Sequence, residues 1–222
     1  MTLSLVFLIL AIVFYLIGAI PYAYHIFHGR VVPHPFSWTV WFLFSVVNGY
    51  IIFESYGYSS LIILMIIRSL ALGAGAILGW IYMSKISIGK IDIIALILAV
   101  GMIFVLKYFW LNEAIISMIA IDLLVLFPTL KKIWIEPRSE DALIWLTSTA
   151  SFVCFILALP SLNFANSGYW IYGITANALV ALLIYRRTLY LSNWKNILKK
   201  YIEYFVLKKR LWFTYLQLNN KI

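Results

Sequence analysis

The chain has 222 residues, of which 64% are hydrophobic, 18% aromatic and only 11% charged. Soluble domains carry about 25% charged residues, so this composition excludes a water-facing globular surface as well as a disordered, collagen-like or coiled-coil chain. Residues 186–222 hold nine basic residues and one acid, and so account for +8 of the net charge of +9. The composition predicts an integral membrane protein whose positive charge belongs to its C-terminal tail. The lone Cys154 excludes a disulfide within the chain.

Seven apolar runs separated by short polar segments predict seven transmembrane helices. A bilayer core of roughly 30 Å needs about 20 helical residues, and the runs lack the alternation of barrel strands. The first run has no basic segment before it and no small-residue cleavage site, which predicts a retained span and not a signal peptide. The runs cover residues 3–20, 36–53, 61–83, 91–107, 112–130, 142–160 and 168–185.

The charges in the connections predict the orientation of the chain. The second and fourth connections contain the acids Glu54 and Glu113, with Lys107 as the one basic residue nearby, and the sixth has no charge. Because cytoplasmic loops are enriched in Lys and Arg, the pattern predicts an outside N-terminus and an inside C-terminus. The basic residues of the first, third and fifth connections are Arg30, Lys85, Lys90, Lys131, Lys132 and Arg138.

An internal repeat relates the two halves. At an offset of 107 residues, Pro21 meets Pro128, Ile26 meets Ile133 and Trp38 meets Trp145. Both segments end an odd-numbered run with proline, cross a basic connection and enter the next run near a tryptophan. The offset also places the third run on the seventh and leaves the fourth unpaired. This predicts a 3+1+3 parallel repeat, with a first three-helix bundle at 1–84, a linker helix at 85–108, a second bundle at 109–187 and a tail at 188–222.

This plan resembles the PQ-loop superfamily, which includes the SWEET and SemiSWEET sugar transporters. The stretches PHPFSWTVW (33–41) and DLLVLFPTLKKIWIEP (122–137) are more similar to an uncharacterised branch of bacterial membrane proteins. The resemblance covers about residues 5–187 and implies a transporter in the bacterial inner membrane, with Pro21 and Pro128 as hinges. The alternative is that each proline ends its helix. The motif's glutamine is absent, since Tyr22 and Thr129 follow the prolines.

Polar residues within the runs predict a substrate or coupling site. Arg68, Asp122 and Asn177 share a layer about 10–12 Å below the outer surface, with Asn48 somewhat shallower. Ionisable residues in transmembrane segments default to a functional hypothesis: Arg68 for an anionic group, Asp122 for a cation or proton, and the asparagines for hydrogen bonds to a ligand. The alternative is a structural Arg68–Asp122 ion pair, and we expect these two residues to pair in the empty protein under either hypothesis. SWEET proteins place an asparagine in the third helix of each bundle, and the resemblance implies that Asn177 has this place in the second bundle. Its repeat mate in the first bundle is Leu70.

Tryptophans and glycines suggest further contacts. Trp38, Trp41 and Trp145 lie toward the inner ends of runs two and six, where an aromatic belt at the interface is the usual explanation. The repeat favours the alternative that they stack on a substrate or close an inner gate. Gly75 and Gly79 form a GxxxG motif, which predicts a close helix contact.

The remaining motif searches give negative expectations. His25, His28 and His34 cluster at the inner mouth, but no HExxH or Cys/His set accompanies them, so we expect solvated loop histidines and no metal. Run seven contains no lysine for a retinal Schiff base, and no nucleophile–base pair is visible. We therefore expect neither a cofactor nor an enzyme.

The pattern of the C-terminal tail predicts what the tail binds. Leu191–Leu218 has an amphipathic pattern flanked by lysines, which favours binding to anionic lipid headgroups. The alternative is docking to a cytosolic partner or a second copy, and neither requires nucleic acid.

The function expected from these patterns is alternating-access transport of a small polar or zwitterionic solute. Vitamin transporters of the nicotinamide riboside type are similar in helix plan, which keeps nucleoside-like substrates open. The alternative is a non-transporting membrane receptor or assembly scaffold, for which the polar layer would be plugged by side chains. The chain contains both halves and so could work alone or as a homo-oligomer.

Overall fold

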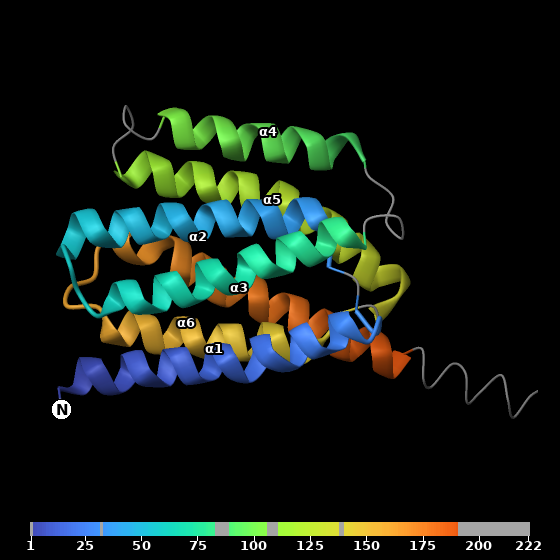
Figure 1. The fold of residues 1–222 in the computed structure, drawn as a ribbon, viewed down its shortest axis with the longest axis horizontal. Coiled ribbons are helices and arrows are strands. Elements are labelled where there is room, and N and C mark those ends of the chain that lie inside the picture. Colours follow the sequence, from blue (N-terminus) through green and yellow to red (C-terminus); the bar gives the residue numbers. More distant parts are fainter. Residues whose placement is uncertain (1, 32, 83–88, 106–110, 138–139, 191–222) are drawn as a thin grey trace, which may run out of the picture. The chain divides into compact units, whose positions relative to one another are not determined.

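The computed structural model describes residues 2–31, 33–82, 89–105, 111–137 and 140–190, which form seven helices and no strand (Figure 1). Five of these helices are long and apolar enough to cross a membrane, and α6 is a shorter apolar helix. The prediction of a helical membrane protein is confirmed at this level. The helices are α1 (Leu3–Phe27), α2 (Pro35–Tyr56), α3 (Leu61–Ile81), α4 (Lys90–Val105), α5 (Leu111–Ile135), α6 (Ala142–Ala158) and an unlabelled last helix, Phe164–Tyr190.

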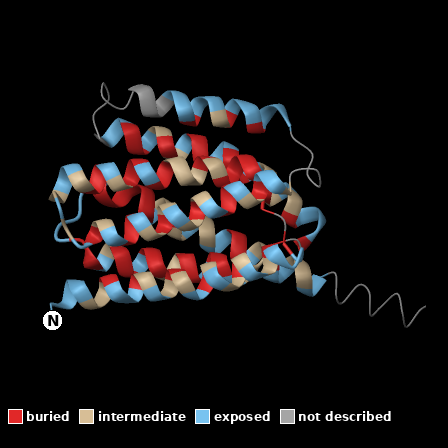
Figure 2. Cartoon of the chain, in the orientation of Figure 1, coloured by how far each residue is buried: buried red, intermediate tan, exposed pale blue. Residues whose placement is uncertain are grey.

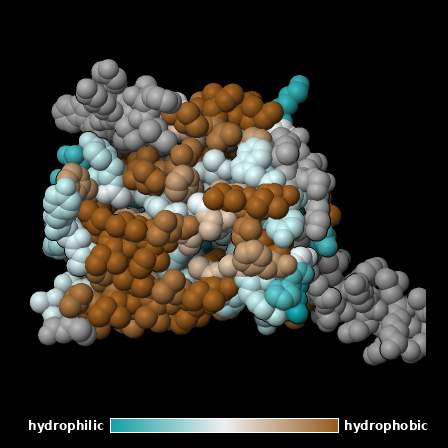
Figure 3. Space-filling view, in the orientation of Figure 1, coloured by the Kyte–Doolittle hydropathy of each residue, from teal (hydrophilic) through white to brown (hydrophobic). Residues whose placement is uncertain are grey.

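The distribution of side chains reverses that of a soluble protein. On α1, Ala11, Tyr15, Gly18 and Tyr22 are buried, whereas Val13 is exposed. This spacing of three and four residues puts one side of the helix against the bundle and the other outside (Figure 2). In the view of Figure 3, hydrophobic side chains cover the middle of the helices, and hydrophilic ones gather toward their ends. Such a surface suits contact with lipid.

Two helix pairs pack closely through glycine. Gly18 of α1 lies against α6, because an added Cβ would stand 2.0 Å from Thr147 Oγ1. Gly75 of α3 lies against α2, because an added Cβ would stand 2.1 Å from Trp38 Cε3. Gly79, also on α3, faces Pro35 at the start of α2. The predicted close contact of the GxxxG motif is therefore confirmed, with α2 as the partner.

Both prolines lie inside helices. Pro21 is followed by a further turn and a half of α1, and Pro128 is followed by two turns of α5. The alternative that each proline ends its helix is wrong. Proline removes one backbone hydrogen bond, but Ile26 and Ile133 beyond the prolines are buried in the apolar core, and this packing keeps the helices continuous. A hinge role stays a prediction.

Three apolar clusters form the core of the first compact unit, residues Met1–Ile184. One lies near the C-terminal ends of α1 and α5, around Ile26 and Ile133. A second lies near the N-terminal end of α1, around Leu8, and a third joins α2, α4 and α5 around Met118.

The second unit is Tyr185–Ile222, of which the structure describes only the end of the last helix. There the Arg187 guanidinium lies 5.3 Å from the centre of the Tyr190 ring. The predicted amphipathic segment Leu191–Leu218 lies outside the described residues.

Candidate functional site

A cavity among the helices of the first unit contains every residue that the sequence singled out for substrate binding. Its empty volume is about 780 Å³ with the open mouth included. This is room for a small solute. The predicted residues that line it are Arg68, Asp122, Asn177, Asn48, Trp41 and Trp145.

The cavity lies part-way along the helices. At 1.5 Å per residue, Arg68 lies about 10 Å from the start of α3, as expected. Asp122 lies about 17 Å along α5, and Asn177 about 20 Å along the last helix. These two lie farther from the starts of their helices than the sequence suggested, because α5 begins at Leu111 and the last helix at Phe164, ahead of their apolar runs. The helices include polar first turns that hydropathy assigns to loops.

Arg68 sits among aromatic rings and not beside an acid. Its guanidinium carbon lies 4.3 Å from the centre of the Phe152 ring, 5.1 Å from that of Trp170 and 5.2 Å from that of Tyr15. Each such contact attracts the cation to the negative face of the ring. Among the ion pairs of the described residues there is none between Arg68 and Asp122. The expected pairing is therefore wrong for this structure, because the rings supply electrostatic stabilisation that a sequence does not reveal.

Asp122 is held by a tryptophan from the neighbouring helix. Trp41 Nε1 of α2 donates a hydrogen bond of 2.6 Å to Asp122 Oδ1 of α5. Asp122 is buried, with 5% of its surface exposed. The cavity therefore holds an acidic and a basic side chain, each stabilised by aromatic residues.

The two asparagines use their amide groups on their own helices. Asn48 Nδ2 donates to Phe44 O at 2.9 Å, and Asn177 Nδ2 donates to Gly173 O at 2.6 Å. These bonds to the preceding turn satisfy one donor of each amide. Both side chains still line the cavity, so the sequence identified their location correctly, while a role in binding stays a prediction.

The tryptophans form an aromatic layer inside the bundle. Trp38 and Trp145 are buried, with 8% and 9% of their surfaces exposed. Trp41 contacts both edge-on, at centroid distances of 5.9 and 5.6 Å, and Trp38 stacks on Tyr22 at 5.0 Å. The interface-belt explanation is therefore wrong for these three. Their place in the sequence fixes their depth but not the side of the helix on which they lie.

Sequence reasoning missed the aromatic residues around Arg68. Tyr15, Phe152, Tyr169 and Trp170 line the cavity, although they look like ordinary core or interface residues in the sequence. The available signal was the charge itself: an arginine inside a membrane needs partners. The sequence gives no means of telling which of 39 aromatic residues they are.

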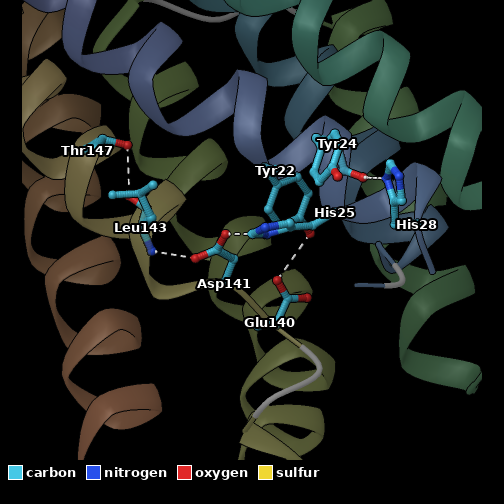
Figure 4. Close-up of polar contacts among 8 residues, drawn as sticks. All are labelled: Tyr22, Tyr24, His25, His28, Glu140, Asp141, Leu143 and Thr147. Atoms are coloured by element: carbon cyan, nitrogen blue, oxygen red, sulfur yellow. Dashed lines mark hydrogen bonds and ion pairs between the residues drawn. The ribbon is translucent and has the colours of Figure 1, made fainter. Parts of the chain in front are cut away.

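A polar network closes the end of the bundle near the first apolar cluster, and Figure 4 shows its members Tyr22, His25, Glu140 and Asp141. Tyr22 Oη of α1 donates to Glu140 Oε2 at 3.1 Å, and Lys132 Nζ of α5 donates to Glu140 Oε1 at 2.6 Å. His25 Nδ1 lies 2.8 Å from Asp141 Oδ2, which joins α1 to the start of α6. Asp141 also caps α6 by accepting from Leu143 N at 2.9 Å. The network therefore ties α1 to both α5 and α6.

The histidines differ from the solvated loop residues that we expected. His25 is paired with Asp141, and His34 is buried, with its Nε2 3.7 Å from Asp92 Oδ1 of α4. Only His28 is exposed; its ring contacts Tyr24 O at 2.8 Å. The expectation is wrong for the first two because His25 lies in the last turn of α1 beside Asp141, and His34 packs against α4. Within the described part of the chain, no group of three His, Cys, Asp or Glu side chains could hold a metal ion.

His34 is expected to make stability depend on pH. Burial lowers its pKa, and Lys132 adds to this, against the opposing effects of Asp92 and Glu140. The unfolded chain then binds more protons below about pH 6.5, so stability is highest above that pH and falls as the pH decreases toward the lowered value. Comparing thermal unfolding at about pH 7.5 and about pH 5.5 should show a smaller pH effect in His34→Gln than in wild type or His28→Gln. An equal pH effect in wild type, His34→Gln and His28→Gln would contradict a role of His34 in the pH dependence of stability.

The chain was compared with protein-family models, with curated proteins and with solved structures, and nothing matches in any of the three.

Proposed function

We propose that the chain is a transporter of a small polar solute in the bacterial plasma membrane. The observation that carries the proposal is the cavity itself. It contains Arg68 and Asp122 at a depth where charged groups are costly and are kept for function. A receptor or scaffold needs no internal space, and a polar layer that faces a cavity favours transport over these roles.

Transport would proceed by alternating access between two three-helix bundles. Within the proposed first bundle α3 touches both α1 and α2, while the most extensive contact of α1 is with α6 of the proposed second bundle. The 107-residue offset pairs α1 with α5 and α2 with α6. Under this exchange the contact of α1 with α6 corresponds to the contact of α2 with α5, and both contacts are present. The proposed arrangement is a parallel repeat with the N-terminus outside.

In this mechanism the network around Glu140 acts as the inner gate. It joins α1, in the first bundle, to α5 and α6, in the second. Rocking of the bundles would break these bonds and open the cavity to the inside, with Pro21 and Pro128 absorbing the bend. The aromatic layer of Trp38, Trp41 and Trp145 would move with it.

Uptake into liposomes tests the proposal. Purified protein is reconstituted and supplied with a mixture of amino acids, organic acids, sugars and nucleosides, and the lumen is analysed by mass spectrometry. Ala176→Trp should reduce uptake at least about tenfold, because Ala176 lines the cavity and the indole would fill it. The matched control is Thr175→Trp, since Thr175 is exposed on the same helix.

Uptake in wild type and in Thr175→Trp, with loss in Ala176→Trp, is the expected result. Equal uptake by both variants would rule out this cavity as the path. Failure of wild-type protein to take up any member of the mixture would count against transport and favour a receptor or scaffold.

A further inference from the structure

Three buried hydrogen-bond donors in the cavity lack a partner. They are Nε and Nη1 of Arg68 and Nε1 of Trp145, none of which bonds to any residue that the structure describes. The Arg68 side chain keeps its charge at any physiological pH, and only 9% of Arg68 is exposed. The aromatic rings around it contact the face of the cation but accept no conventional hydrogen bond from its edge. These N–H groups are therefore buried without an acceptor in the described part of the chain, and such groups in a native structure call for one.

Among the described residues that line the cavity, the fully buried polar atoms without a partner are all donors. Of the side-chain acceptors that line it, none in the described residues is both buried and without a partner. Asp122 accepts from Trp41, and the two asparagines donate to their own helices. On the described wall of the cavity, the fully buried atoms without a hydrogen-bond partner are thus the N–H donors of Arg68 and Trp145. A ligand that complements it must present oxygen acceptors and, opposite Arg68, a negative charge.

We propose that this cavity binds the carboxylate group of a small ligand through the N–H groups of Arg68 and Trp145. The inference rests on the proposed transport function and names its substrate class. Organic acids and amino acids share this group. The rings of Tyr15, Phe152 and Trp170 provide an apolar surface for the rest of the ligand. An amino acid would in addition place its ammonium group in the same cavity as Asp122, which keeps the total charge of the site balanced.

Matched probes separate the carboxylate from the rest of the molecule. Thermal unfolding of the full chain in neutral detergent is measured with acetate, benzoate, 3-phenylpropanoate, L-alanine and L-phenylalanine. Phenethylamine, glucose and uridine serve as probes that lack a carboxylate. At least one carboxylate should stabilise wild type, while phenethylamine, glucose and uridine should not. Stabilisation by L-phenylalanine but not by 3-phenylpropanoate would indicate an amino-acid site, and the reverse an organic-acid site.

Three variants test which residues hold the group. Arg68→Gln should weaken the binding of the stabilising carboxylate ligand at least about tenfold. Trp145→Phe keeps an aromatic ring but loses the N–H, and should weaken this binding several-fold. Arg30→Gln is the matched control, because Arg30 is exposed, and it should bind like wild type. If Arg68→Gln does not fold, Arg68→Lys takes its place, since it keeps the charge and loses the planar fork.

The outcomes distinguish this inference from the transport proposal. If no carboxylate stabilises wild type, or one stabilises Arg68→Gln equally well, the inference is overturned. Uptake of glucose or uridine that is insensitive to Arg68→Gln also overturns it, yet leaves transport standing. A carboxylate that binds through Arg68 but is never taken up supports the inference and contradicts transport.

Discussion

Glu140→Ala is expected to lower the free energy of unfolding by about 3 kcal/mol. The Glu140 carboxylate accepts hydrogen bonds from Lys132 Nζ at 2.6 Å and from Tyr22 Oη at 3.1 Å, and only 2% of its side chain is exposed. Removing it leaves the Lys132 ammonium without this counter-charge and the buried Tyr22 hydroxyl without its acceptor. Reversible unfolding in mixed detergent micelles measures the change.

Two further variants show which part of this loss comes from charge. Glu140→Gln keeps an oxygen that Tyr22 can reach but removes the counter-charge of Lys132, so an intermediate loss is expected. Glu54→Ala is the control, because Glu54 is an exposed acid at the end of α2, where a change under about 0.5 kcal/mol is expected. A loss in Glu140→Ala no larger than in Glu54→Ala would show that the network does not hold α1 to α5 and α6.

Glu140→Gln also tests the proposed inner gate. If the network must break for the cavity to open inward, weakening it should favour the open form and leave transport possible. Under the receptor or scaffold alternative, the variant has no such effect on solute movement. Uptake measured beside stability in Glu140→Gln therefore separates a gate from a purely structural tie.

Gly75→Ala is expected to destabilise the protein by about 1–3 kcal/mol and to reduce uptake at least about tenfold. The added Cβ would lie 2.1 Å from Cε3 and 2.4 Å from Cζ3 of Trp38. That ring is fixed between Tyr22 and Trp41, so either it moves into the cavity that it lines or α3 moves away from α2. Both changes alter the site.

Gly101→Ala is the matched control. Gly101 also lies within a helix, α4, but an added Cβ there has no atom within 4 Å. Since alanine is the better helix former by roughly 1 kcal/mol, this variant should be as stable as wild type or slightly more so. Thermal unfolding and liposome uptake of the pair give the result. If Gly75→Ala behaves like Gly101→Ala, the close approach of α3 and Trp38 is not important for the site.

Aromatic residues replace counter-ions in this cavity. Arg68 faces three rings, and Asp122 accepts from an indole N–H. In a membrane interior, such contacts stabilise a charge without pairing it permanently with another charge. Nε and Nη1 of Arg68 therefore have no acceptor among the described residues, whereas a tight Arg68–Asp122 pair would have used them.

The sequence by itself determined the all-helical class, the existence of seven helices and the apolar character of the long ones. Hydropathy and length suffice for this, because a bilayer demands long apolar helices of nearly fixed length. The positions of Arg68, Asp122, Asn48 and Asn177 in one cavity also followed, since distance along parallel helices converts directly into depth.

Only the tertiary structure decided how side chains meet across helices. It brought Tyr15, Phe152 and Trp170 around Arg68, placed the tryptophans inside the bundle, and joined Tyr22 to Glu140 over a separation of 118 residues. The physical reason is that the apolar runs are hydrophobic on every side. When the lipid-facing and core-facing sides of a helix have similar polarity, the sequence carries little information on its rotation, and packing against neighbours sets it.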